Sequence, residues 1–200
     1  MKTTAFIIIS AAVILCAVML LICEKRNTDV KKLVLTGVMT ALSVTGRFVF
    51  APFPGFKPVT AMVVLTGMYL GCSSGFMCGA LTAFVSNFYF GQGPWTPFQM
   101  IVWGLIGIIS GVMSESLKKE KLMLVIFGIG SAILYSFLMD IYTVIWTIDG
   151  WSWAFYGTAV ASAVPYTITY AVSNVVFLLT LAGPVGRKVG RIYKKYCIPR

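Results

Sequence analysis

A thirteen-residue segment from Asn87 to Gln99, reading NFYFGQGPWTPFQ, concentrates side chains that could bind a ligand. Its amides supply hydrogen-bond donors and acceptors, its tryptophan supplies a flat ring, and its glycines and prolines interrupt regular helix. The flanking sequence is almost wholly apolar, and hydrocarbon tolerates broken backbone only where protein or a water-filled cavity satisfies its polar groups. The segment therefore predicts a pocket or mouth where a ligand is recognised.

The chemistry predicted for this segment is binding without catalysis. No GxxxxGK[ST] phosphate loop is present, so the chain does not hydrolyse ATP in that manner. Without histidine there is no HExxH zinc site and no Ser/His dyad. The cysteines show no C-x-x-C spacing and are expected to be small apolar residues: Cys16, Cys23, Cys72, Cys78 and Cys197. We therefore expect no enzyme activity, no metal and no cofactor.

The composition places this segment in a membrane. Hydrophobic residues make up 58% of the 200 positions, charged residues 11%, and the mean hydropathy is +0.90. Apolar runs long enough to cross about 30 Å of hydrocarbon recur along the chain. They predict an all-α integral membrane protein with seven spans, the first of which is a retained anchor rather than a cleaved signal. The spans are expected at 4–23, 33–51, 58–72, 74–91, 97–115, 121–146 and 155–183.

Charge placement predicts how these spans are oriented. Short loops that hold Lys and Arg stay in the cytosol. All cations except Lys2, Arg47 and Lys57 follow the first, fifth or seventh span, and because an even number of spans separates these groups, all three lie on the same side. The amino terminus is therefore expected outside and the carboxyl terminus in the cytosol, which puts the segment from Asn87 to Gln99 at the outer face. Topology also explains the net charge of +10 without a nucleic-acid partner. The basic groups are Lys25, Arg26, Lys31 and Lys32; Lys118, Lys119 and Lys121; and Arg187, Lys188, Arg191, Lys194, Lys195 and Arg200.

Two ionisable side chains, Arg47 and Asp140, are predicted at membrane depth. A charge at a helix centre costs about 2.5 to 3.5 kcal/mol on insertion scales, so both should face the bundle interior or a wet cavity. They could pair with each other or with backbone groups, or they could contact a ligand, and the sequence leaves both readings open. Asn174 lies in the middle of the last span, where an amide is expected to join helices.

Small residues recur at four-residue spacing and predict close helix contacts. Most of these rows, including Gly67 to Gly71, Gly75 to Gly79 and Gly107 to Gly111, are expected to be internal packing. The row Thr36, Gly37, Thr40 and Ala41 could instead form an outward face for another membrane subunit.

Three stretches of the sequence resemble one transporter family. They are the row around Gly37 and Ala41, FPGFKPVTAMVVLTG from Phe53 to Gly67, and GALTAFVSNFYFGQGPWTPFQM from Gly79 to Met100. Spans two to seven are similar to a substrate-binding S component of the energy-coupling factor (ECF) vitamin transporters, and most similar to the branch that includes cobalamin-specific members. The chain departs from that six-helix plan through its first span, which divides it into 1–30, an additional transmembrane helix with a basic loop, and 31–200, the S-component domain with a basic tail.

The resemblance implies a plasma-membrane protein that captures a vitamin at the outer face, with cobalamin or a related corrinoid as the expected ligand. It implies delivery to a transmembrane coupling protein driven by two cytosolic ATPases, with the vitamin bound as substrate rather than cofactor. The coupling protein would contact the family's small-residue motif, here Thr36, Gly37, Thr40 and Ala41. Ligand contacts would come from Phe53, Lys57, Asn87, Gln92, Trp95, Gln99 and Asp140.

Two other functions fit parts of the sequence. In a solitary permease or channel for a small polar solute, Arg47 and Asp140 would line an ion-coupled path. A structural membrane subunit would have no ligand. The ECF reading requires a coupling protein and ATPases in the purified complex, whereas a permease works alone in liposomes with an ion gradient.

Overall fold

The computed structural model describes residues 3–26, 29–148 and 150–196, and within the first helix it describes the side chains of residues 10, 11, 13–22 and 25. The side chain of Cys23, together with Cys197 and Arg200, lies outside this description. Over the described residues the protein is all-α, with eight helices and no strand. The helices are α1 Thr3–Arg26, α2 Val30–Val49, α3 Val59–Leu70, α4 Cys72–Phe90, α5 Thr96–Val112, α6 Ser114–Lys119, α7 Lys121–Thr147 and α8 Trp153–Tyr196.

The predicted all-α membrane fold is confirmed, because seven of the eight helices coincide with the seven apolar spans. Among the described residues, α2, α7 and α8 are long and apolar enough to cross a membrane, and apolar helical segments also occur at Val13–Ile22 within α1, at Val59–Leu70 and at Thr96–Val112. The remaining helix, α6, is a short polar helix with the sequence SESLKK, so no apolar run predicts it. The last helix is longer than the span predicted from 155 to 183, since the basic tail continues it to Tyr196.

The predicted interruption between Asn87 and Gln99 is shorter than its composition indicates. The helix α4 continues to Phe90 and ends at Gly91, whose φ of +102° is a left-handed conformation that favours glycine. The next helix, α5, begins at Thr96 with a proline in its first turn. Both Asn87 and Gln99 therefore lie on helices, and the connection between the helices is Gly91 to Trp95.

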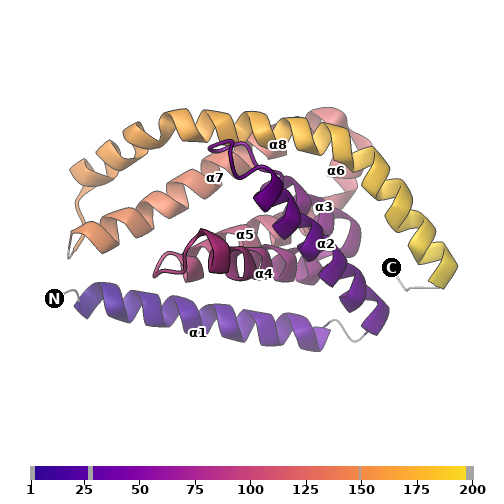
Figure 1. The fold of residues 1–200 in the computed structure, drawn as a ribbon, viewed down its shortest axis with the longest axis horizontal. Helices are drawn as coiled ribbons and strands as arrows, with labels where there is room; N and C mark the ends of the chain where they lie inside the picture. The colour runs from indigo at the N-terminus through magenta and orange to yellow at the C-terminus, as the bar shows by residue number, and fades with distance from the viewer. Residues whose placement is uncertain (1–2, 27–28, 149, 197–200) are drawn as a thin grey trace.

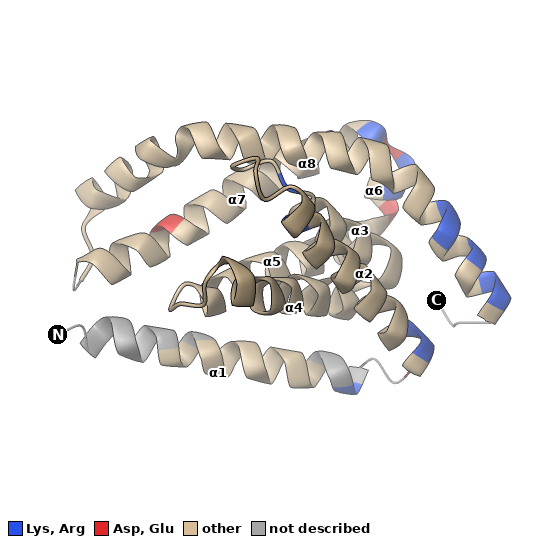
Figure 2. Cartoon of the chain, viewed as in Figure 1, with Lys and Arg blue, Asp and Glu red and all other residues tan. Residues whose placement is uncertain are grey.

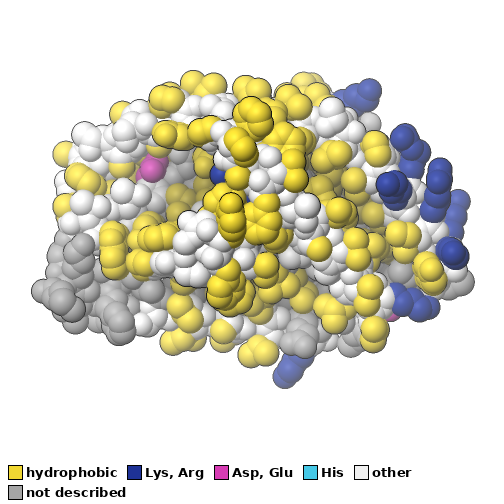
Figure 3. Space-filling model, viewed as in Figure 1, with side chains coloured by type: hydrophobic (Ala, Val, Ile, Leu, Met, Phe, Trp, Pro, Cys, Tyr) yellow, Lys and Arg dark blue, Asp and Glu magenta, His cyan; other side chains and the backbone are white. Residues whose placement is uncertain are grey.

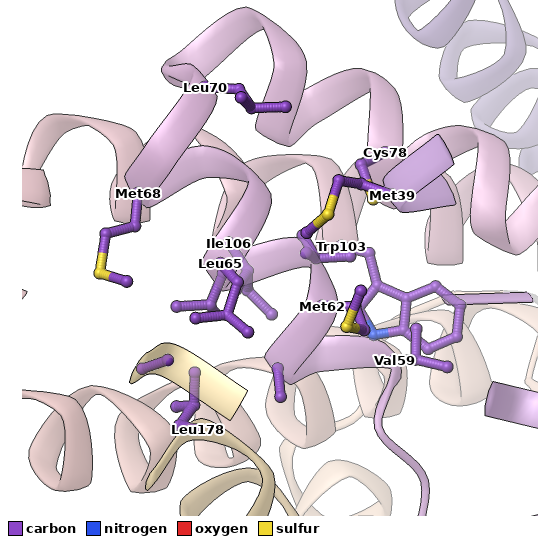
Figure 4. Packing of buried hydrophobic residues seen from close by; sticks show 14 of the residues in the cluster. Met39, Val59, Met62, Leu65, Met68, Leu70, Cys78, Trp103, Ile106 and Leu178 are labelled. Atoms are coloured by element: carbon purple, nitrogen blue, oxygen red, sulfur yellow. The ribbon is translucent and has the colours of Figure 1, made fainter. Parts of the chain in front are cut away.

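Three helices, α3, α4 and α5, form a tightly packed unit that we call the platform. Every residue of α3 is buried except Tyr69. A Cβ atom built on Gly75 would lie 2.4 Å from the Gly107 carbonyl oxygen and 2.8 Å from the Gly67 Cα atom, so these backbones touch. The predicted internal role of these small-residue rows is confirmed. Figure 4 shows buried hydrophobic side chains of the core, with Leu65 of α3 beside Ile106 of α5.

The last two long helices, α7 and α8, form an antiparallel hairpin that we call the arm. It runs along one side of the molecule and its far end extends past the platform (Figure 1). In α8 no residue before Ser173 is buried, and the buried ones are Ser173, Asn174, Leu178, Ala182 and Val189. In the half of the arm that lies farther from the platform, α7 and α8 therefore pack mainly against each other.

On the other side of the platform, α1 packs against α4 and α5 (Figure 1). Cys16 of α1 is 2% exposed and belongs to a small apolar cluster with Phe76, Met77 and Ala80. The helix that the six-helix plan lacks is therefore in contact with the body of the protein.

The basic groups lie together at one end of the molecule, which we call the basic end (Figure 2). The start of α2 meets the end of α8 there, since the Lys31 ammonium donates a 2.7 Å hydrogen bond to the Tyr196 carbonyl. Figure 3 shows the same gathering of blue side chains on the surface, beside a body with few charges. The connections α2–α3, α4–α5 and α7–α8 lie away from this end.

Candidate functional site

A small cavity lies between the platform and the arm. Its volume is about 50 Å³, and its lining comes from α2, the α2–α3 connection, α3, α5, α7 and α8. The lining residues come from five helices and one connection, so only the folded bundle brings them together. The lining residues are Arg47, Lys57, Val59, Thr60, Gln99, Trp103, Ala132, Tyr135, Tyr170 and Asn174.

Arg47 anchors the polar side of the cavity. Its side chain is 8% exposed and donates hydrogen bonds from Nη1 to the Ser86 hydroxyl and, at 2.9 Å, to the side-chain Oδ1 of Asn87. The guanidinium also lies over two rings, 4.7 Å from the centroid of Phe90 and 5.1 Å from that of Trp103. These contacts stabilise a cation at membrane depth with neutral groups. Asp140 is not among the described partners of Arg47, so a pairing of these two charges, one of the alternatives that the sequence left open, is not found.

The amides predicted as ligand contacts form a connected hydrogen-bond network next to Arg47. The side-chain Nδ2 of Asn87 donates to the Thr96 hydroxyl and to the side-chain Oε1 of Gln99, both at 2.9 Å. The Thr96 hydroxyl donates in turn to Gln92, and the Gln99 amide donates to the Tyr135 hydroxyl at 2.9 Å. The network thus runs from α2 through α4 and α5 to the arm and fixes the orientation of Gln99 at the cavity.

Three aromatic rings form the apolar wall of the cavity. Trp103 and Tyr135 stack with ring centroids 5.3 Å apart and an interplanar angle of 22°, and Tyr170 meets Tyr135 edge-on at 5.6 Å. The Trp103 indole N–H is buried and has no hydrogen-bond partner among the described residues. A buried donor without a partner costs about 1–3 kcal/mol, so this N–H is suited to an acceptor on a ligand.

Lys57, in the connection between α2 and α3, adds a second cation to the lining. Its ammonium lies 4.9 Å from the centroid of Phe90, the ring that Arg47 also contacts. Burial, followed by the positive charge of Arg47, lowers the pKa of the Lys57 ammonium below its ordinary value. Its backbone carbonyl accepts a 3.0 Å hydrogen bond from the Ser173 hydroxyl, which ties this connection to α8.

The residues that the sequence predicted as ligand contacts fall into three groups by their place relative to the cavity. Lys57 and Gln99 line the cavity, and Asn87 and Gln92 belong to the adjoining hydrogen-bond network. The third group lies elsewhere: Phe53, Trp95 and Asp140 are not among the lining residues.

Phe53 and Trp95 face outward from their connections, with exposed fractions of 57% and 37%. The Trp95 ring packs over Gly93, where an added Cβ would lie 2.2 Å from the ring. Asp140 is on α7, and its Oδ2 atom is buried without a hydrogen-bond partner among the described residues. We have no physical account of that unpaired carboxylate oxygen.

The aromatic wall was not predicted from the sequence, because Trp103, Tyr135 and Tyr170 resemble ordinary residues of apolar spans. One signal was present for Trp103, since it follows Gln99 by four residues and therefore shares its helix face. Asn174 has the predicted role of joining helices: its amide donates to the Gly128 carbonyl at 3.1 Å and to the Ser131 hydroxyl at 3.3 Å.

Two other hollows are larger but have different surroundings. One of about 520 Å³ lies at the basic end and is lined by residues such as Lys32, Tyr69 and Lys118. The other, of about 330 Å³, is an apolar groove between α1 and the α4–α5 connection. Neither combines stacked rings with converging polar groups, so the cavity between platform and arm is the candidate ligand site.

The architecture and this site define a helical membrane protein with a ligand pocket between packed helices and no catalytic constellation in its lining. Residues 27–189 match the family model for the S component of ECF-type riboflavin transporters. The chain belongs to this family, and it is therefore a substrate-binding transport subunit rather than an enzyme, with no cofactor of its own. Comparisons with curated proteins and with solved structures find no match.

Proposed function

We propose that this S component captures a planar aromatic vitamin, of the flavin type, in the cavity between platform and arm. The observation that carries the proposal is the stacked pair Trp103 and Tyr135 beside a buried indole N–H without a partner. Flat rings favour a flat ligand, and an unpaired donor favours a ligand edge with oxygen or nitrogen acceptors. Membership of a family described for riboflavin transport supports the same ligand class.

The size of the cavity implies that the ligand enters by displacing the arm. A volume of about 50 Å³ holds a few water molecules, whereas pockets for small molecules measure about 300–1,000 Å³. The platform cannot yield at its glycine contacts, because backbone atoms already touch there. The contacts between the arm and the rest of the site are fewer, and they include the Gln99–Tyr135 and Ser173–Lys57 hydrogen bonds. We therefore expect binding to separate α7 and α8 from α5 and the α2–α3 connection.

The corrinoid expected from the sequence resemblance is a less favoured ligand in this proposal. Cobalamin is much larger than a flavin and would require a correspondingly larger opening between Trp103 and the arm. The family description names riboflavin, and the stacked rings suit a ligand of one flat ring system. Cobalamin remains a prediction, and identification of the bound small molecule tests it directly.

We propose that the protein lies in the plasma membrane with its basic end in the cytosol and the ligand site toward the outside. Three basic groups that are far apart in the sequence lie at one end of the bundle, as the positive-inside rule requires of cytosolic segments. The amino terminus is then outside and the carboxyl terminus is cytosolic. The helix α1 precedes the matched region 27–189, and we propose that it is an addition to the six-helix unit formed by the rest of the chain.

We further propose that the protein docks on a transmembrane coupling protein driven by two cytosolic ATPases, through the outward face of α2. Gly37 and Ala41 are exposed, and a Cβ atom on Gly37 would meet nothing within 4 Å. Thr36 and Thr40 are buried instead, and their hydroxyls bond to carbonyls of their own helix. The docking surface is therefore narrower than the four-residue motif expected from the sequence, with Gly37 and Ala41 as the points of closest approach.

The ligand proposal is tested by purifying the protein from cells and identifying the bound small molecule by mass spectrometry. A flavin is the expected result. A corrinoid, which would colour the protein red, would replace the flavin proposal with the cobalamin one. A protein without a vitamin that moves a solute alone in liposomes with an ion gradient would be the rival permease.

The docking proposal is tested by replacing Gly37 with Leu and measuring co-purification with the coupling protein and ATPases. Association should fall at least about tenfold while vitamin binding stays unchanged, because a bulky side chain blocks close helix approach. Gly130→Leu is the matched control, since Gly130 also has open space around its Cβ position but lies on α7. Equal association of the two variants would count against α2 as the docking helix.

A further inference from the structure

The cavity holds two cations without an acid among its lining residues. Arg47 and Lys57 both line it, and both lie over the Phe90 ring. The acceptors that Arg47 uses are the neutral oxygens of Ser86 and Asn87. A membrane protein would be expected to neutralise charges at this depth with a carboxylate, and here it does not.

The hydrogen bonds of these cations leave donors for a ligand. Both bonds that Arg47 makes to described residues come from Nη1, whereas a guanidinium carries five N–H donors. The Lys57 ammonium donates no hydrogen bond to a described residue, and its contact is with the face of Phe90. Each cation lowers the cost of bringing an anion into the cavity, because the two positive charges repel each other until a negative charge lies between or beside them.

Lys57 is the better of the two cations to replace in a test of ligand binding. Arg47 joins α2 to α4 through Ser86 and Asn87, so its removal would disturb the fold as well as the site. Lys57 lies in a connection where its side chain holds no helix, and the pKa of its ammonium is lowered by burial and by Arg47. Its described partner is the face of the Phe90 ring, and no acid lies among the residues that line the cavity with it.

We propose, resting on the proposed function, that the ligand of this site carries an anionic group, a carboxylate or a phosphate, which Arg47 and Lys57 bind while its flat ring contacts Trp103 and Tyr135. Charge-assisted hydrogen bonds from Lys57 and from the free guanidinium donors of Arg47 hold the anion. The site then distinguishes anionic from neutral ligands that share one ring system. Riboflavin itself, which is neutral, becomes the weaker member of such a series.

The test compares three probes that share the flavin ring. They are riboflavin, riboflavin 5′-phosphate and a flavin whose side chain ends in a carboxylate, each titrated against the purified full-length protein by calorimetry. One or both anionic probes should bind at least about tenfold tighter than riboflavin. The two anionic probes differ in geometry, so the tighter one identifies carboxylate or phosphate as the preferred group.

The variant Lys57→Gln should reduce this preference at least about fivefold, and Lys57→Arg should retain it. Lys118→Gln is the matched control, because Lys118 also lies over a ring, that of Tyr69, but at the basic end. Riboflavin binding as tightly as both anionic probes, or a preference unchanged in Lys57→Gln, would overturn the inference and leave the flavin function intact. Failure of all three probes to bind would overturn both the inference and the proposed function.

Discussion

The platform and the arm are both built from apolar helices, yet they pack in different ways. In the platform, glycines bring the backbones of α3, α4 and α5 into contact, and nearly all of α3 is buried. In the arm, the outer half of α8 buries no residue, and α7 and α8 mainly contact each other. The candidate site lies where these two regions meet, so one wall is held rigidly and the other by a few side-chain contacts.

This difference assigns separate tasks to the two regions. Backbone contacts leave no room for adjustment, since a close-packed interior has no free volume to absorb a shift. Side-chain hydrogen bonds such as Gln99–Tyr135 can break and form again at a net cost of about 1 kcal/mol each. We infer that the platform keeps Arg47, Gln99 and Trp103 in place while the arm moves to admit a ligand.

Adding one methyl group to each region should give the largest difference in stability between the platform and the arm. Gly75→Ala should lower the free energy of unfolding by about 1–3 kcal/mol or more, because its Cβ would meet backbone atoms of Gly107 and Gly67. Gly130→Ala on the arm should be neutral or stabilising by up to about 1 kcal/mol, since the position is open and alanine favours helix. Denaturant unfolding in detergent measures both. Equal losses of stability would show that the platform is not the more tightly packed region.

The second prediction concerns the rigid wall of the site. Trp103→Phe should weaken vitamin binding about tenfold, because it removes the buried indole N–H that we propose donates to the ligand. It should not lower stability through lost hydrogen bonding, since that N–H has no partner among the described residues. Trp95→Phe is the control, because Trp95 does not line the cavity and should leave affinity unchanged. Calorimetric titration measures the affinities. A larger loss of affinity in Trp95→Phe than in Trp103→Phe would mean that the ligand binds at the α4–α5 connection instead.

The smallest predicted effect concerns the hydrogen bond between Gln99 and Tyr135, which joins the platform to the arm. Tyr135→Phe removes the acceptor of the Gln99 amide and should destabilise the contact between arm and platform by about 1 kcal/mol. Hydrogen exchange should then increase in α7 and α8 but not in α3. Tyr156→Phe, which removes an exposed hydrogen bond within the arm, should change stability by less than about 0.5 kcal/mol. Faster exchange in the platform as well would mean that the two regions open together.

Much of the site could be anticipated because amides are rare in apolar sequence. Asn87, Gln92 and Gln99 were expected to act together, and they do belong to one hydrogen-bond network. Trp95 was the preferred tryptophan, but the tryptophan that lines the cavity is Trp103, which lies inside α5, whereas Trp95 precedes that helix. A tryptophan in a broken segment is conspicuous in sequence, whereas one inside a span looks like any apolar residue.

The partners of Arg47 could not be predicted either, because they lie on other helices. Arg47 was expected to need a partner, but the sequence did not distinguish Asp140 from a ligand or from neutral groups. In the structure Arg47 has Ser86, Asn87 and two rings as neighbours, and these come from helices other than its own. Which face of α2 meets α4 depends on how the helices rotate against each other, and a single sequence does not contain that rotation.

The amino-acid sequence by itself determined the membrane environment, the number of long helices and the common end of the basic groups. These properties follow from local composition, because the length of an apolar run and the charge beside it act independently of the other helices. Only the tertiary structure decided that residues from α2, α5, α7 and α8 line one cavity, and that the α2 threonines turn inward. Such contacts join positions far apart in the chain, and they depend on the packing of whole helix faces rather than on any one segment.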